Sequence, residues 1–355
     1  MTDDDDVSNE ERLVVKVHFG KPISEESLPR LKLANKALPG GLFHKVDFRE
    51  TDFRGADLRE TTFDHCDLKG ARFDGAVLRG AVFNDCDATG THWHGAHMRN
   101  MRIVGTKLER AIMIGADLNL ATLVRSSLDH ADLSGAGLDR TAITECTARK
   151  AKLDQIGLHQ VTFHKCVLDE ATFDGSRFQL GMFNETPLVD RSFAGMDIMG
   201  VQFIAADLSG CNFTEASIAK CNFKGSILDN ALFTGAKAPN ALFPDAKGTR
   251  CDFSKADLNQ AIFSTSSWTQ CNFDRARLYQ AIFQQAVLVD CNLRDADLTY
   301  ADFSHAGIEG CDFIGAGMFR TKLHKVRDAG ARFSDRARAL ETDPDLARGE
   351  EWPAA

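Results

Sequence analysis

Several residue types and patterns are scarce in this 355-residue sequence. Tyrosine occurs twice and proline eight times, whereas phenylalanine occurs 25 times. No run of 18 apolar residues occurs and the mean hydropathy is -0.24, so we expect no membrane-spanning helix. The opening residues, MTDDDDVSNEER, are acidic and contain no apolar segment, so we expect no secretory signal.

Sequence motifs of catalytic sites are also absent. The chain has no glycine-rich phosphate loop, no nucleophile elbow and no His-Glu-x-x-His pattern. We therefore predict a protein that is not an enzyme and needs no cofactor. Ten cysteines in a long chain without an expected signal are predicted to be reduced thiols, which places the protein in the cytoplasm.

A five-residue repeat runs through most of the sequence. Residues 46–333 form 58 consecutive units, each with a small residue followed two positions later by a large apolar one. In CNLRDADLTYADFSHA (291–306), for example, Cys291 precedes Leu293 and Ala296 precedes Leu298. All ten cysteines occupy the small position. A period of five fits neither a helix nor a strand, and a fixed, unbroken period predicts a solenoid.

The spacing within each unit indicates which side chains face inward. Two residues that are two positions apart point the same way on an extended segment, so the small and large residues share one interior. The polar residue between them faces out. The remaining two positions turn a corner, which suits the many glycine, asparagine and aspartate residues found there. Each unit is thus one short side of a coil, and coils stack through parallel backbone hydrogen bonds.

Two patterns predict the number of sides. Of the 22 phenylalanines in the large position, 20 lie at numbers ending in 3, so phenylalanine-rich and leucine-rich sides alternate and their number is even. Four cysteines recur every 20 residues, an interval of four five-residue units: Cys251, Cys271, Cys291 and Cys311. The sequence therefore predicts an all-β solenoid whose coils have four five-residue sides, with equivalent residues of successive coils stacked in columns.

The units resemble those of the pentapeptide repeat family, as in Ala56-Asp57-Leu58 and Cys211-Asn212-Phe213. The resemblance covers about four fifths of the chain. It implies a right-handed quadrilateral β-helix.

The segments outside the repeat are predicted to cap it, because a solenoid otherwise exposes the edges of its terminal coils. Residues 1–45 are interpreted as an acidic tail and cap, with a strand over 12–19 and a short helix over 24–38. Residues 334–355, which include Trp352, are interpreted as a polar helix or tail. Docking of a partner on these segments is the alternative, as is a homodimer that pairs through a terminal coil.

A few residues break the repeat. Arg191 in a small position and Asp328 in a large one would bury charges, which is costly without partners. We interpret Arg191 as turned outward by a local bulge, with a partner contact as the alternative, and Asp328 as part of a frayed last coil. Gly248 precedes Trp268 by one coil and is predicted to make room for the indole. Residues 98–158 have no phenylalanine in the large position, and we assign this section no function.

One histidine cluster raises the question of a metal site. In HWHGAH (92–97), the stacking of coils is expected to place Asp74 beside His94 and Asp117 beside His97. Zinc needs three or four converging ligands. A solvated face is the preferred interpretation, so we predict no metal site.

Two functions are compatible with such a scaffold. The first is a rigid scaffold for protein partners; residues 318–352 resemble proteins associated with bacterial type VI secretion, which implies an accessory role there. The second comes from the resemblance to family members that mimic B-DNA, bind type II topoisomerases and protect them from quinolones. Residues 46–333 carry a net charge of only -5, whereas DNA carries about one charge per 1.7 Å. The sequence therefore favours the first function, without direct nucleic-acid or membrane binding.

Candidate partner-binding residues lie where the sign of the surface charge changes. The span 291–312 is rich in acidic residues, including Asp297 and Asp302, and basic residues follow at once, including Arg320 and Lys322. An acidic surface followed by a basic one suits a specific protein contact. We predict these four residues as the partner-binding site.

Overall fold

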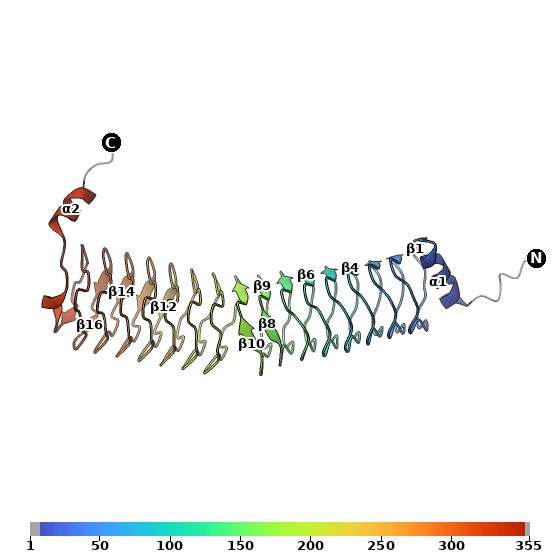
Figure 1. The fold of residues 1–355 in the computed structure, drawn as a ribbon, viewed down its shortest axis with the longest axis horizontal. Coiled ribbons are helices and arrows are strands. Elements are labelled where there is room, and N and C mark those ends of the chain that lie inside the picture. The colour runs from blue at the N-terminus through green and yellow to red at the C-terminus, as the bar shows by residue number, and fades with distance from the viewer. Residues whose placement is uncertain (1–7, 352–355) are drawn as a thin grey trace, which may run out of the picture. The chain divides into compact units, whose positions relative to one another are not determined.

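The computed structural model describes residues 8–351, which form two compact units, one ending at Gly181 and the other beginning at Met182. Each unit is a stack of coils, drawn in Figure 1 in blue to green for the first unit and in green to red for the second. No helix within the described residues is long and apolar enough to cross a membrane.

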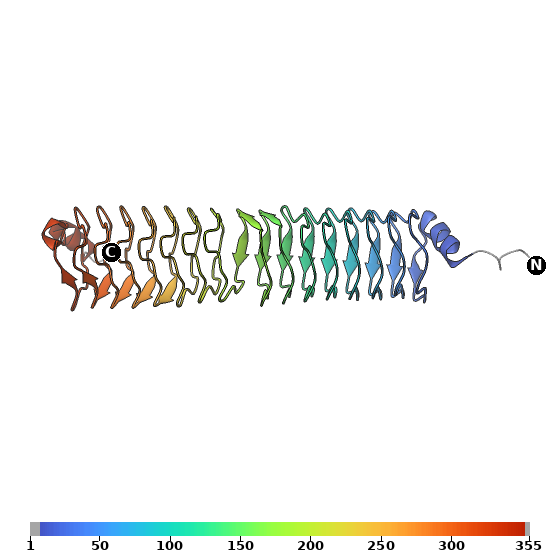
Figure 2. The ribbon, with the colours of Figure 1, turned by 90° about the horizontal axis from the view of Figure 1, so that it is seen from below.

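The regular elements of the first unit are one helix and short strands. They are α1 (Asn9–His18), β1 (Ile23–Ser24), β2 (Leu42–His44), β3 (Thr62–Asp64), β4 (Val82–Asn84), β5 (Arg102–Val104), β6 (Thr122–Val124), β7 (Ala142–Thr144), β8 (Gly157–His159), β9 (Thr162–His164) and β10 (Arg177–Gln179). Strands β1 to β7 pair in sequence order and β7 pairs with β9, all in parallel, so they lie side by side on one face (Figure 2).

The second unit has strands near its start and end and a helical C-terminal segment. Its elements are β11 (Met182–Asn184), β12 (Lys247–Thr249), β13 (Ser267–Thr269), β14 (Val287–Val289), β15 (Gly307–Glu309), β16 (Asp312–Phe313), β17 (Arg332–Phe333), the 3-10 helix η1 (Arg336–Arg338) and α2 (Pro344–Glu350). Strands β12 to β15 pair in order, and between named strands single residues continue the parallel pairing.

The register confirms coils with four five-residue sides. Strand pairing joins each residue to its equivalent one coil later, as in Phe43 with Phe63 and Gly248 with Trp268. Both the small and the large positions are buried almost throughout, and all ten cysteines are buried. Phe263 shows the packing of one column: its ring stacks on those of Phe243 and Phe283, with centroids 4.7 and 4.6 Å apart.

The corners have a conformation that side chains rarely adopt. Within residues 8–351, forty-three non-glycine residues have positive φ, and each lies at a residue number that is a multiple of five. Their φ values fall between 47° and 63°, which is the left-handed region. This bend, repeated every fifth residue, turns the chain from one side of the coil to the next.

The structure corrects both predictions for the segment that precedes residue 46. Residues 12–19 belong mostly to α1 rather than to a strand: Ser8 caps the helix, and Leu13 and Val17, one helical turn apart, are the side chains it buries. Residues 24–38 are not helical but form the first coil, because Leu28, Leu33 and Leu38 continue the five-residue spacing and are buried.

Contacts of α1 with this coil close the start of the first unit (Figure 1). The carboxylate of Glu26 accepts from Lys16 Nζ at 2.5 Å and from Arg12 Nη2 at 3.1 Å. Residues 334–351 close the end of the second unit, where Arg338 and Leu340 bond to the last full coil. Trp352, expected in this segment, lies outside the described residues.

The predictions for the three residues that break the repeat have different outcomes. At Arg191 the backbone keeps the regular pattern, with N donating to Leu188 O and O accepting from Asn212 N, so the predicted bulge is wrong; the side chain is half-buried. Asp328 is not frayed, because its carboxylate forms an ion pair with Arg336 of the closing segment. The prediction for Gly248 is confirmed: a Cβ there would lie 2.7 Å from Trp268 Cζ3.

Candidate functional site

Three exposed aromatic rings follow one corner of the last coils in the second unit. Tyr279, Tyr300 and Phe319 are 37%, 39% and 42% exposed. Neighbouring rings meet edge to face, with centroids 5.8 Å apart in both pairs. The guanidinium of Arg338 lies 5.5 Å from the Phe319 centroid. We call these three rings the aromatic corner.

The coil register explains why the rings meet. Tyr279 and Phe319 lie two coils apart and share one column of the corner, and Tyr300 lies in the adjacent column. Tyr300 N donates to Phe319 O at 3.0 Å, which ties the two coils together. Such an exposed row differs from the other corners of the repeat, most of which carry polar side chains.

The four predicted site residues lie at or beside the aromatic corner, but only two of them form an ion pair with each other. Lys322 Nζ lies 3.4 Å from Asp302 Oδ2 on the side that follows the corner. Asp297 lies on the side that precedes the corner, and Arg320 lies at the corner itself, one coil after Tyr300. Both are exposed, and neither forms an ion pair within residues 8–351.

Asp302 is held by several donors. Ser304 donates to Oδ1 through its hydroxyl at 2.6 Å and its backbone N at 2.9 Å, and Gln284 Nε2 donates to Oδ2 at 3.0 Å. Burial raises the pKa of Asp302, but these hydrogen bonds and Lys322 outweigh it and lower the pKa below the ordinary value. Asp302 is therefore a fixed, ionised carboxylate whose negative charge is balanced by Lys322. Asp297 and Arg320, by contrast, have no charged partner among the described residues.

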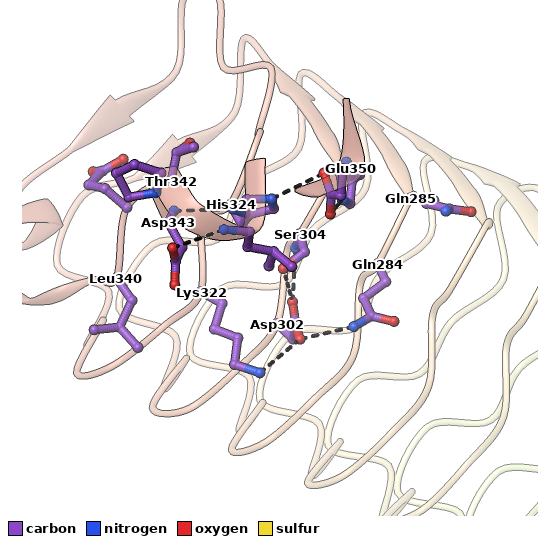
Figure 3. A pocket seen from close by; sticks show the side chains of 14 residues that line it. Gln284, Gln285, Asp302, Ser304, Lys322, His324, Leu340, Thr342, Asp343 and Glu350 are labelled. Atoms are coloured by element: carbon purple, nitrogen blue, oxygen red, sulfur yellow. Dashed lines mark hydrogen bonds and ion pairs between the residues drawn. The ribbon is translucent and has the colours of Figure 1, made fainter. Parts of the chain in front are cut away.

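A cavity of about 780 Å³ lies beside Asp302, between the last coils and the segment that carries α2 (Figure 3). Asp302, Ser304, Lys322 and His324 line it from the coils. From the closing segment, the cavity is lined by residues that include Leu340, Thr342, Pro344, Leu346 and Glu350. The lining is therefore mostly polar, with apolar side chains contributed by Leu340, Pro344 and Leu346 of the closing segment.

Glu350 fastens α2 over this cavity. Its carboxylate lies 3.0 Å from Lys325 Nζ, 3.1 Å from His305 Nε2 and 3.3 Å from His324 Nε2. The hydrogen bond from Lys325 is the main cause that lowers the pKa of Glu350 to about 2, with the two histidines contributing. On the other edge of its ring, His324 Nδ1 accepts the N–H of Asp343 at 3.2 Å.

The aromatic corner is the part of this surface that the sequence prediction missed. A signal was present, because Tyr279 and Tyr300 are the chain's two tyrosines and their spacing is one coil plus one position. That spacing places them on neighbouring coils at one corner. Phe319 is less visible in the sequence, since phenylalanine is abundant and usually inward.

The histidines of residues 92–97 do not form a ligand group. Among the described residues, three potential ligand atoms converge within 4.8 Å in two places: His44, Asp64 and His65 in the first unit, and His305, His324 and Glu350 in the second. His97 does pair in register with Asp117, and Asp74 Oδ1 accepts the backbone N–H of His94 at 3.2 Å.

Comparison with known families establishes what kind of chain this is. A model of the pentapeptide repeat region matches residues 41–113, and a model of pentapeptide repeats matches residues 102–140, 197–235, 226–264 and 271–306. Together they cover more than half of the sequence. The chain therefore belongs to the pentapeptide repeat family, and its fold is the right-handed quadrilateral β-helix.

Two solved structures of other proteins are among those similar to this chain. HetL, a pentapeptide repeat protein involved in heterocyst differentiation in the cyanobacterium Nostoc sp. strain PCC 7120, is 22% identical, with 81% of this chain and 94% of HetL covered and a TM-score of 0.19. QnrB1, a plasmid-mediated fluoroquinolone resistance protein, is 19% identical over 56% of this chain and 87% of its own, with a TM-score of 0.23. None of the curated proteins matches this chain.

Proposed function

We propose that this protein is a non-enzymatic scaffold that binds a protein partner at the aromatic corner. The observation that carries the proposal is the exposed row of Tyr279, Tyr300 and Phe319 between two unpaired charges, Asp297 and Arg320. The partner inserts an apolar anchor between the rings. It also presents a carboxylate to Arg320 and a cation to Asp297.

The physical chemistry of interfaces supports this choice of surface. Tyrosine and arginine are enriched among residues whose truncation costs the most binding free energy. Aromatic rings bring a large contact area with few rotatable bonds, and the rings here are already ordered by one another and by Arg338. The β-helix holds them on a rigid backbone, which lowers the entropy lost on binding.

The charges of the first unit argue against mimicry of DNA. Many of its surface carboxylates pair with basic side chains, as Asp47 does with Arg49 at 2.7 Å and Asp52 with Arg54 at 2.6 Å. A DNA mimic must present uncompensated negative charge along its length. These pairs cancel much of the charge that a topoisomerase would recognise.

The proposal also covers the cellular compartment of the protein and the larger system to which it belongs. The cytoplasm suits a chain with ten buried cysteines, because its reducing conditions keep thiols reduced. The similarity of residues 318–352 to proteins associated with bacterial type VI secretion suggests an accessory protein of that system. Components of the secretion spike and sheath are therefore the first partners to test.

The test compares the whole chain with a Tyr300→Ala/Phe319→Ala variant. Each is immobilised, and binding of purified spike and sheath components from the native host is measured by interferometry. We expect the variant to lose at least about tenfold in affinity, which corresponds to roughly 1.4 kcal/mol. Asp297→Lys is expected to weaken the same complex.

A matched control separates this effect from general loss of exposed apolar surface. Met199 is 51% exposed and lies on the same corner four coils before Tyr279, about 19 Å away at the spacing of stacked strands, so Met199→Ala should bind like the parent. Equal binding by the parent and the double-alanine variant would refute the corner as the site. Inhibition of DNA gyrase supercoiling that is lost in Asp297→Lys would favour the DNA mimic instead.

A further inference from the structure

We propose that His44, Asp64 and His65 bind a divalent transition-metal ion such as Zn²⁺ on the surface of the first unit. Their ligand atoms, two imidazole nitrogens and a carboxylate oxygen, lie within 4.8 Å of one another. His44 and Asp64 are half-buried and His65 is exposed, so an ion can reach the group from solvent.

The fold fixes these residues in place. His44 is the last residue of β2 and Asp64 the last of β3, and the two pair in register on neighbouring coils. His65 follows at the corner with a φ of 53°, and its backbone N donates to Asn84 O at 2.9 Å. All three side chains therefore project from paired backbone rather than from a mobile loop.

The three side chains already converge, and hydrogen bonds join them in this structure. Asp64 Oδ2 lies 2.6 Å from His44 Nδ1, and Asp64 Oδ1 lies 3.0 Å from His65 Nδ1. In a tetrahedral zinc site with bonds of about 2.0–2.1 Å, neighbouring ligand atoms are about 3.3 Å apart. Small outward rotations of the two rings suffice to admit an ion, and water takes the fourth position.

Neighbouring groups are placed as an outer shell would be. Asn84 Nδ2 donates to Asp64 Oδ1 at 2.6 Å, which orients the carboxylate. Asp85 Oδ2 lies 3.9 Å from His65 Nε2, the nitrogen that carries the proton when Nδ1 binds a metal. Metal-bound histidines commonly face such a carboxylate with the second nitrogen.

The group in the second unit does not share these properties. His324 Nδ1 accepts the N–H of Asp343, so the neutral ring carries its proton on Nε2, the nitrogen that faces Glu350. Nε2 of His324 could bind a metal only if its proton moved to Nδ1, which would break the bond from Asp343, whereas no hydrogen bond within the described residues occupies Nε2 of His44 or His65. The ammonium group of Lys325, 3.0 Å from Glu350, also opposes a cation there. We therefore assign His305, His324 and Glu350 to fastening α2.

Zinc titration of the folded, untagged, metal-stripped protein tests the proposal. Isothermal titration calorimetry is expected to show one equivalent of Zn²⁺ that is lost in a His44→Gln/His65→Gln variant and in Asp64→Asn. Zn²⁺ should also raise the melting temperature of the parent and leave that of the two variants unchanged, because an ion that binds only the folded state stabilises it.

His159 supplies the control. Its Nδ1 lies 2.5 Å from Asp139 Oδ1, and this pair is not part of a three-ligand group among the described residues. His159→Gln should keep the equivalent of zinc. The proposal is overturned if the histidine double variant and Asp64→Asn bind as many zinc ions as the parent with equal affinity, or if the parent binds none.

Discussion

At the residue scale, the inward positions carry most of the stability. Phe263 is fully buried and lies between two stacked rings of its own column. Phe263 also meets the phenylalanine column of the opposite side edge to face, with its ring centroid 6.1 Å from that of Phe253. A cavity in one column therefore removes contacts in two directions.

Phe263→Ala is expected to lower the free energy of unfolding by roughly 3–5 kcal/mol, the usual range for truncating a buried phenylalanine. Guanidinium denaturation followed by circular dichroism measures this loss. Gln260→Asn is the control, because Gln260 lies at an outward corner with a φ of 58°, a conformation that asparagine accepts well. Similar unfolding midpoints for the two variants would contradict the inward assignment of Phe263.

The cysteine thiols are expected to resist modification in the folded protein. Burial raises the pKa of Cys146 to about 12, that of Cys166 to about 11 and that of Cys211 to about 12, and the thiolate is the reactive form. A bulky maleimide at pH 8 should label few of the ten cysteines in the native state and all of them in 6 M guanidinium, as counted by mass spectrometry. Rapid native labelling of these three residues would contradict their burial.

Residue patterns predicted the columns well but the site only in part. The spacing of small and large residues determines which side chains face inward, so the partners of Phe263, Gly248 and the cysteines followed from arithmetic. The ion pairs could not be predicted in this way, because they depend on side-chain rotamers and on segments outside the repeat. The repeat pattern offered Asp328 no partner, since Arg336 lies in the closing segment and not one coil away.

At the element scale, the first and last segments were harder to predict than the coils. Residues 12–19 alternate in polarity, but they have no strand to pair with, whereas a helix satisfies its own backbone and buries Leu13 and Val17. Residues 24–38 contain good helix formers, and the five-residue spacing of their leucines prevailed because stacking on the next coil buries them. Tertiary packing outweighed local preference in both cases.

Helix α2 is expected to detach in acid. The lowered pKa of Glu350, about 2 against an ordinary 4.5, means that its bonds to Lys325, His305 and His324 stabilise the closed segment above pH 4.5. That contribution falls as the pH drops through 4.5 toward 2. Hydrogen exchange of residues 344–350, corrected for the intrinsic rate, should accelerate over this window while residues 263–283 stay protected.

Glu350→Gln isolates the carboxylate. The variant should exchange faster than the parent in residues 344–350 at pH 7, and its corrected rate should change little between pH 4.5 and 2. If parent and variant show the same acid response, another group fastens α2.

At the scale of the whole molecule, the repeat makes stability local. Coils of a solenoid contact chiefly their neighbours, so the effect of a defect decays along the stack. Phe263→Ala is accordingly expected to speed hydrogen exchange in residues 243–283 and to leave residues 53–93 at the parent rate. Uniform acceleration along the chain would instead mean that all coils open together.

The left-handed corners have a consequence for how such a protein changes over time and how it can be engineered. A non-glycine residue in this conformation costs roughly 1 kcal/mol relative to glycine, so glycine is favoured at those corner positions whose side chains form no stabilising contact. Tyr300, Arg320 and His65 all occupy them. Their side chains contribute nothing to the buried core, so selection for stability alone would not keep them. Libraries that vary only every fifth residue can therefore give the β-helix new recognition surfaces, with glycine as the neutral starting residue.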